Sequence, residues 1–239
     1  MLLSHYLPKL ITALLGGLFI FAGMYTFGTP LLFDRLFICI LVFTAIVCRK
    51  NINILGVVLI LVLQRLVEET AWSISELEFT DLIKASFYLL SIAVYCKIKY
   101  DKASRLLLLS LIISIFAEFY WIFYQIIAPE IYWYITLQSS YLFARHLFFM
   151  RVAYMSDLLP KQQVESVNLD WQMYKLNALF AALQMFMIIE YIIRTVFGYT
   201  KVMLIWTSYP YLAQLCYTYL IWIVFYESYK LLIPKLLRA

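Results

Sequence analysis

The chain has 239 residues, of which 65% are hydrophobic and only 14% charged, and its formal net charge is +5. Soluble domains carry about 25% charged residues and roughly 45–50% apolar residues, so this composition argues against an ordinary soluble fold and favours a membrane protein. The positive charges lie in short clusters between apolar segments. They indicate loops that set membrane topology and give no sign of a nucleic-acid-binding surface.

Apolar segments long enough to cross a bilayer follow one another along most of the chain. They predict eight transmembrane helices, at residues 10–27, 31–48, 54–72, 82–98, 106–128, 131–150, 174–197 and 202–226. Seven helices remain an alternative, with the second or the fourth segment re-entrant. The expected fold is therefore all-α: a polytopic integral membrane helical bundle that forms a single transmembrane domain over residues 1–239.

Two features between and within these segments predict local structure. The longest connection, residues 151–172, is expected to be a cytoplasmic loop. In this loop Asp157 and Pro160 predict the cap and the first turn of a short surface helix. Pro210 predicts a kink in the eighth helix, because proline removes a backbone hydrogen bond.

The distribution of lysine and arginine sets the expected orientation. With the N-terminus inside, most positive residues fall on the inner side, and the acidic connection at residues 73–81 falls outside. Trp72, Trp133 and Trp206 then lie at the outer interface, where an aromatic belt is expected. Both termini are predicted to be cytoplasmic. Because the chain has no Asn-x-Ser/Thr sequon, a bacterial plasma membrane is the favoured location.

The fifth segment, residues 106–128, carries one ionisable residue, Glu118, near its middle. At 100° per residue its polar side chains share one face, and the other faces are apolar. This polar face consists of Ser110, Ser114, Glu118, Trp121 and Gln125. A helix with this pattern lies in lipid and turns its polar face toward protein or water. Glu118 is therefore the main candidate for an ion or proton site near the membrane midplane, with Gln125 on the same face.

Ionisable residues inside the other spans are also candidates, because each costs a few kcal/mol unless it finds a partner or water. Under the orientation above they fall in the outer parts of their helices, which predicts a polar vestibule open to the outside with Glu118 toward its floor. The vestibule residues are Arg65, Glu68, Glu69, Glu190 and Arg194, together with Asp34, Arg35 and Lys84.

Helical spacing predicts pairs among these residues. Arg65 is placed to bridge Glu68 and Glu69, and Glu190 is placed to pair with Arg194. Asp81 and Lys84 have a similar i, i+3 spacing. Glu118 has no basic residue within one turn, so its partner is expected from another helix, with Arg65 and Arg194 as the candidates. Ion pairs that only fix helix packing explain the paired residues equally well.

The sixth segment contributes Arg145 and His146 near its inner end. They are candidates for an inner gate, or for contact with a lipid headgroup or another anion. The commoner explanation is that Arg145 extends to the inner interface and that His146 makes an ordinary hydrogen bond.

Polar faces also occur on the seventh and eighth segments. In the eighth, Tyr211 and Gln214 share a face next to Pro210, as at the broken helices of transporter binding sites. Asn177 and Gln184 form a similar face in the seventh. Hydroxyls and amides that join helices are the commoner explanation of both faces.

Motifs for nucleotide binding, for hydrolase nucleophiles and for zinc proteases do not occur in the sequence. Two histidines, and four cysteines without a CxxC pair, do not suit a usual metal centre. We therefore expect no metal, no cofactor and no conventional catalytic residue.

Three functional classes fit these observations. The first, and the main prediction, is a transporter or channel for a small solute or ion that uses Glu118 and the outer vestibule. The second is a non-catalytic membrane subunit, a sensor, anchor or assembly partner, that forms a homo-oligomer or docks a membrane or cytosolic subunit through its basic cytoplasmic loops. The third is a membrane-embedded enzyme acting on a lipid or isoprenoid, with Glu118 or the Glu68 and Glu69 pair as acid–base groups. Membrane lipids are expected partners in all three.

Overall fold

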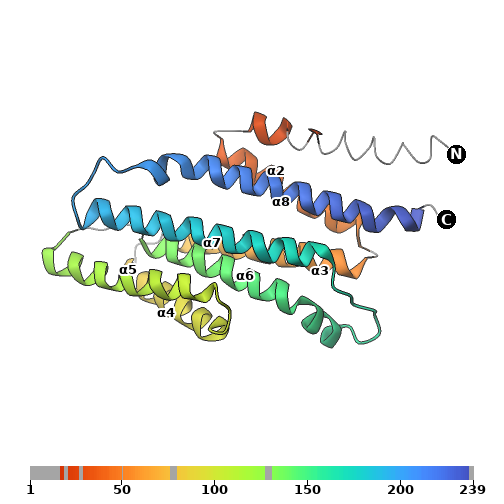
Figure 1. Ribbon diagram of the computed structural model, residues 1–239, viewed down its shortest axis with the longest axis horizontal. Coiled ribbons are helices and arrows are strands. Elements are labelled where there is room, and N and C mark those ends of the chain that lie inside the picture. Colours follow the sequence, from red (N-terminus) through yellow and green to blue (C-terminus); the bar gives the residue numbers. More distant parts are fainter. Residues whose placement is uncertain are drawn as a thin grey trace. The chain divides into compact units, whose positions relative to one another are not determined.

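The computed structural model describes residues 17–18, 21–26, 29–49, 51–75, 80–126 and 131–236. These residues form the α-helices α2 to α8, residues 17–18 and 21–25 are also helical, and no strand occurs among them, which confirms the predicted all-α class for this part of the chain (Figure 1). The helices are α2 (Pro30–Val47), α3 (Ile52–Ser75), α4 (Thr80–Ile98), α5 (Ser104–Tyr124), α6 (Ile131–Leu158), α7 (Asn168–Thr195) and α8 (Leu204–Leu236). Most of the predicted first span and part of the acidic connection lie outside the described residues.

The helix α5 ends four residues before its predicted end. Gln125 adopts the left-handed conformation, with φ 51° and ψ 36°, and its backbone N–H bonds to the carbonyl of Ile122. A left-handed residue at this position closes an α-helix. Gln125 is therefore the exposed C-cap of α5, and the prediction that it shares the protein-facing polar face is wrong.

The connection predicted at residues 151–172 is mostly helical. The helix α6 continues through Asp157 to Leu158, and Pro160 follows its end, so the predicted short helix at this point is wrong. α7 begins earlier than expected because Asp170, in its first turn, accepts the backbone N–H of Val167 at 3.0 Å. An acidic residue at this position that reaches back to the N-cap amide fixes a helix start.

Among the described helices, α5 and α7 are long and apolar enough to cross a membrane. α3 falls outside this set because Arg65, Glu68 and Glu69 lie within five consecutive residues. The larger number of spans and the multi-pass arrangement stay predictions.

The helix α5 carries its serines and Trp121 on its buried side, together with small and aliphatic residues, and large apolar residues on its exposed side. Ser110, Ser114 and Trp121 are buried, whereas Phe119 and Phe123 are 66% and 81% exposed. A helix on the surface of a soluble domain has the opposite arrangement. The prediction that the serines and the tryptophan face protein is confirmed.

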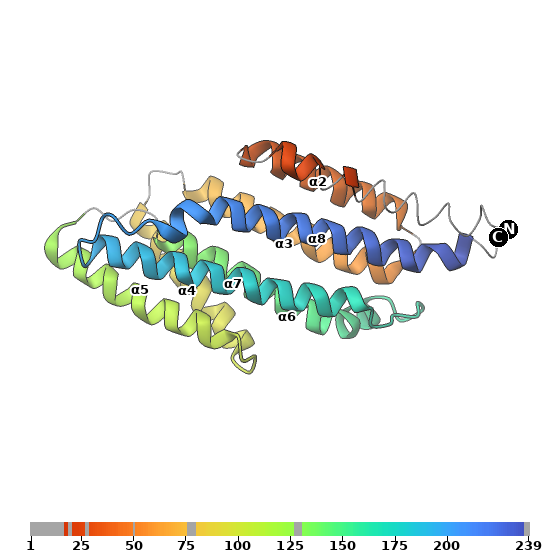
Figure 2. The same cartoon turned by 45° about the horizontal axis from the view of Figure 1, so that its top comes forward.

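Contacts divide the chain into two compact units. The first unit contains Met1–Val62, Phe148–Met173 and Pro210–Ala239, and the second contains Leu63–Leu147 and Tyr174–Tyr209. In the second unit, α4 and α5 lie side by side as an antiparallel hairpin (Figures 1 and 2). α6 and α7 also run antiparallel there, and the rings of Tyr141 and Phe180 stack between them at 4.9 Å.

Candidate functional site

The charged centre of the second unit lies between α4 and α5. The Lys84 ammonium is 3.8 Å from one carboxylate oxygen of Glu118, and the Tyr88 hydroxyl donates a hydrogen bond to the other at 3.3 Å. Lys84 and Tyr88 are four residues apart on α4, so both reach the same point on α5. We call these three residues the Glu118 centre.

The cation beside Glu118 is thus Lys84, and the prediction of Arg65 or Arg194 as its partner is wrong. Sequence reasoning considered Lys84 only with Asp81 on its own helix. The spacing of the two residues from the α4–α5 turn could nevertheless have predicted this pair. Lys84 and Glu118 lie the same number of residues from the helix ends that meet at the α4–α5 turn, and an antiparallel hairpin brings such positions together.

The Glu118 centre is held loosely. Charge-assisted hydrogen bonds are usually about 2.7–2.9 Å long, and both contacts of this carboxylate are longer. The side chains of Lys84 and Glu118 also remain 21% and 18% exposed. Glu118 therefore keeps the capacity to accept a proton or to contact another cation.

The predicted pairs of Arg65 on α3 are confirmed. Its guanidinium lies 2.9 Å from Glu68 and 3.4 Å from Glu69, and the Gln64 amide donates to Glu68 at 3.1 Å. Glu68 is buried, whereas Glu69 is 54% exposed at its side chain. All these contacts form within one helix, which is why spacing alone predicted them.

Glu190 has a different partner from the one predicted. Its two carboxylate oxygens accept the backbone N–H groups of Ile205 and Trp206 at 2.6 and 2.8 Å, in the first turn of α8. Arg194 instead lies over the Trp206 ring at 5.8 Å, and the predicted Glu190–Arg194 pair is not among the contacts of the described chain. The free amides and the positive end of the helix dipole make an α8 N-terminus a strong partner for a carboxylate.

Arg145 holds the turn between α4 and α5. Its guanidinium contacts the Asp101 carboxylate at 2.8 and 3.3 Å, donates to the Tyr174 carbonyl at 2.7 Å and stacks on the Tyr174 ring at 3.4 Å. Burial opposes ionisation of Asp101, but hydrogen bonds from Arg145 and from the Ala103 amide outweigh it, so the pKa of Asp101 is below its ordinary value. Sequence reasoning missed Asp101. Roles for Arg145 or the half-buried His146 in a gate or a headgroup site stay predictions.

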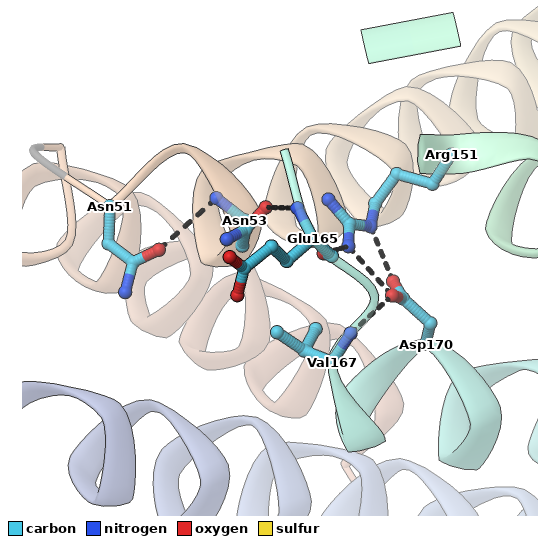
Figure 3. Close-up of polar contacts among 6 residues, drawn as sticks. All are labelled: Asn51, Asn53, Arg151, Glu165, Val167 and Asp170. Carbon is cyan, nitrogen blue, oxygen red and sulfur yellow. Dashed lines mark hydrogen bonds and ion pairs between the residues drawn. The ribbon is translucent and has the colours of Figure 1, made fainter. Parts of the chain in front are cut away.

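A second buried ion pair, which sequence reasoning also missed, lies in the first unit. Figure 3 shows Arg151 of α6 reaching Asp170 of α7, with 2.7 Å between Nη2 and Oδ2. The same Nη2 donates to the Glu165 carbonyl, and the Glu165 amide donates to the Asn53 side chain at the start of α3. Arg151 is only 1% exposed. We call these residues the Arg151 cluster. It was missed because both charged residues were assigned to a solvated loop.

Gln214 joins two segments of the first unit. Its amide donates to the Gly23 carbonyl at 2.6 Å, and a Cβ on Gly23 would lie 2.9 Å from the Thr218 hydroxyl. The backbone near Gly23 thus packs closely against α8. Gln214 thus links α8 to the backbone at Gly23, as the commoner explanation predicted. Tyr211 is exposed on the same helix.

The described part of the chain is thus all-α, and within it two helices, α5 and α7, have the length and apolarity needed to cross a membrane. No family model, curated protein or solved structure matches the chain.

Proposed function

We propose that the chain is a multi-pass membrane protein that moves a proton or a small cation, with Glu118 as the group that binds it. The observation that carries the proposal is the Glu118 centre: a carboxylate in α5, a helix long and apolar enough to cross a membrane, held loosely by Lys84 and Tyr88. An ionisable residue in an apolar span is costly, so it is expected to serve a function or to be firmly paired. Glu118 is paired, but weakly.

Loose binding is the property that ion movement requires. A permeating ion must bind well enough to enter and weakly enough to leave. A carboxylate closed by short bidentate bonds would release neither a proton nor a cation on a useful timescale. In the proposed cycle, Glu118 exchanges its contact with Lys84 for the transported ion, and the buried polar side of α5 borders the path.

The network around Arg65 forms the proposed outer entrance. Glu69 is exposed, the adjacent Glu68 is buried, and Arg65 contacts both, so we propose that the two carboxylates pass cations from the surface into the second unit. The predicted topology, with both termini cytoplasmic and this end of α3 outside, is part of the proposal.

The test is ion flux in proteoliposomes. The purified protein is reconstituted with an enclosed pH-sensitive dye, a potassium gradient with valinomycin sets the membrane potential, and the rate of internal pH change is recorded. The same vesicles are then examined with sodium and potassium gradients. Glu118→Gln should lower the flux more than about tenfold, because it removes the charge that attracts the ion.

Asp157→Asn is the matched control. It removes an exposed carboxylate near the end of α6 that belongs neither to the Glu118 centre nor to the proposed entrance, so its flux should stay within about twofold of wild type. Wild-type vesicles that conduct no faster than empty ones would refute the proposal, as would an unchanged rate in Glu118→Gln.

A second candidate function is a non-catalytic membrane subunit, and the α4–α5 turn favours it. Four basic residues are exposed on and beside this turn, which Arg145 and Asp101 hold in place: Lys97, Lys99, Lys102 and Arg105. A rigid basic surface is suited to docking an acidic partner. Vesicles without flux, together with a co-purifying protein that is lost when Lys99 and Lys102 are both changed to Glu, would favour this function.

A further inference from the structure

Each of the four main helices of the second unit contributes one fully buried polar residue. They are Ser91 of α4, Ser114 of α5, Gln138 of α6 and Gln184 of α7, and each is 0% exposed. We call these four residues the polar layer, because contacts between neighbouring helices place them at one depth.

The first of these contacts join α4 to α5. Lys84 and Tyr88 both meet Glu118, and the two helices are antiparallel. Moving one turn forward from Tyr88 reaches Ser91, and moving one turn back from Glu118 reaches Ser114. Ser91 and Ser114 are therefore level with each other on facing helices.

The next contact joins α5 to α7, which run in the same direction (Figures 1 and 2). Trp121 and Tyr191 meet edge to face at 5.9 Å. Seven residues, or two turns, before them lie Ser114 and Gln184, on the same faces of the two helices. Ser114 is therefore level with Gln184.

The last contacts join α6 to α7. The Gln138 amide donates to the Ala181 carbonyl at 3.0 Å, and Ala181 is one turn from Gln184. The Tyr134–Tyr191 contact lies on one side of this level, and the Tyr141–Phe180 stack lies on the other. Gln138 therefore completes the layer.

The polar layer is rich in hydrogen-bond acceptors without partners. The Gln138 amide N–H₂ is used by Ala181, and that of Gln184 donates to the Tyr209 hydroxyl. Within the described residues, no partner reaches the Oε1 atoms of Gln138 and Gln184 or the hydroxyls of Ser91 and Ser114. A buried polar atom left in this state destabilises the folded protein, because it has lost its hydrogen bonds to water. Four such atoms at one level indicate a site built for a ligand.

We propose that the polar layer binds one dehydrated monovalent cation, of the sodium or potassium class, through these neutral oxygens. Amide and hydroxyl oxygens suit hard cations, and carbonyl oxygens replace the hydration shell of monovalent ions in channels and transporters. The layer has no carboxylate of its own, which disfavours divalent ions. Glu118, one turn beyond Ser114 and about 6 Å along α5, supplies a nearby negative charge. The identification of this cation as the transported ion rests on the proposed function.

The test is the thermal unfolding of the full-length protein in detergent. Midpoints are compared in sodium, potassium and choline chloride at equal ionic strength. Saturating sodium or potassium should raise the wild-type midpoint by about 5 °C over choline, because the cation binds the folded state only. A wild-type midpoint that is the same in all three salts would overturn the proposal.

Ser114→Ala distinguishes cation binding from a general salt effect. In choline its midpoint should equal or exceed that of wild type, because the change removes an unpartnered buried hydroxyl. In sodium or potassium the cation-dependent rise should be lost. Ser91→Ala should behave in the same way, and it provides the test if Ser114→Ala is poorly produced. A rise of wild-type size in both variants would overturn the proposal.

Ser86→Ala is the matched control on α4. Its hydroxyl is exposed and bonds to the carbonyl of Leu82 in its own helix, so the cation-dependent rise should be unchanged. Flux is measured separately on the same preparations. A cation-dependent midpoint without flux would refute the proposed function and support the cation site. Proton flux without a cation-dependent midpoint would support the proposed function and refute the cation site.

Discussion

The Arg151 cluster of the first unit and the Glu118 centre of the second each contain an ion pair between two helices. The two ion pairs differ in distance and in burial. Arg151 is 1% exposed and meets Asp170 through two hydrogen bonds. Glu118 meets Lys84 at 3.8 Å, and both side chains are partly accessible. The difference indicates that the Arg151 cluster stabilises structure, and that the Glu118 centre is free to exchange partners.

The chemistry of the groups that contact each carboxylate explains this difference. A planar guanidinium binds a carboxylate bidentately and stays charged, so it suits a permanent contact. A lysine ammonium is a flexible point charge, and a phenol is a neutral donor. A carboxylate between these two groups can change its protonation or its cation at a smaller cost.

Removal of Asp170 should have the largest effect on stability. Asp170→Ala leaves the buried charge of Arg151 without its partner and should cost about 3–5 kcal/mol, measured by thermal unfolding and by yield. The double variant Arg151→Met, Asp170→Leu should recover most of this loss, because no unpaired charge remains. If Asp170→Ala unfolded at the wild-type temperature, the Arg151 cluster could not be a structural pair.

The Asp101–Arg145 pair should show a smaller loss with a characteristic pH dependence. Asp101→Asn should cost roughly 2 kcal/mol, because it weakens the bonds that hold the α4–α5 turn. The folded state lowers the pKa of Asp101 from its ordinary value of 3.8, so its stabilisation is fully present above that pH and is lost as the pH falls below it. The difference between the midpoints of wild type and Asp101→Asn should therefore shrink as the pH falls from 3.8 toward the lowered pKa of Asp101 in the folded state. A constant difference down to pH 3 would contradict this account.

Glu190→Gln should cost about 1–2 kcal/mol, because it removes the charge that caps the first turn of α8. Arg194→Gln is the comparison that separates the two explanations of Glu190. If Glu190 served mainly to neutralise Arg194, the two substitutions would cost similar amounts. The observed geometry predicts that Arg194→Gln costs less than half as much in the same unfolding experiment.

The smallest effect concerns Gln125. Gln125→Gly should stabilise the protein by about 0.5–1 kcal/mol, because glycine adopts the left-handed conformation of this C-cap without strain. Flux should stay at the wild-type rate, since the side chain is exposed at the end of α5. A large loss of flux in this variant would contradict this account and would indicate that Gln125 takes part in ion movement.

The sequence predicted those features that depend on one helix at a time. Apolar runs located the described helices, the polar face of α5 was found from its period, and the pairs of Arg65 followed from i, i+3 and i, i+4 spacing. The end of α5 was less predictable, because it depends on one backbone conformation, that of Gln125.

Contacts between helices were not predictable in the same way. The partner of Glu118 depends on the register of the α4–α5 hairpin, and that of Glu190 depends on where α8 begins. Asp101 and Asp170 were missed because both lie at connections, where sequence patterns indicate solvent rather than buried partners. The polar layer needed four helix registers at once, which no local pattern supplies.

Ion flux through the Glu118 centre tests the central claim most directly. Wild type, Glu118→Gln and Glu118→Asp are reconstituted at equal protein-to-lipid ratio, and their initial flux rates are compared under one imposed potential. We expect the Gln variant to fall more than about tenfold and the Asp variant, which keeps the charge on a shorter side chain, to retain an intermediate rate. A Gln variant that conducts within about twofold of wild type would contradict the account, because a neutral amide would then serve as well as the carboxylate.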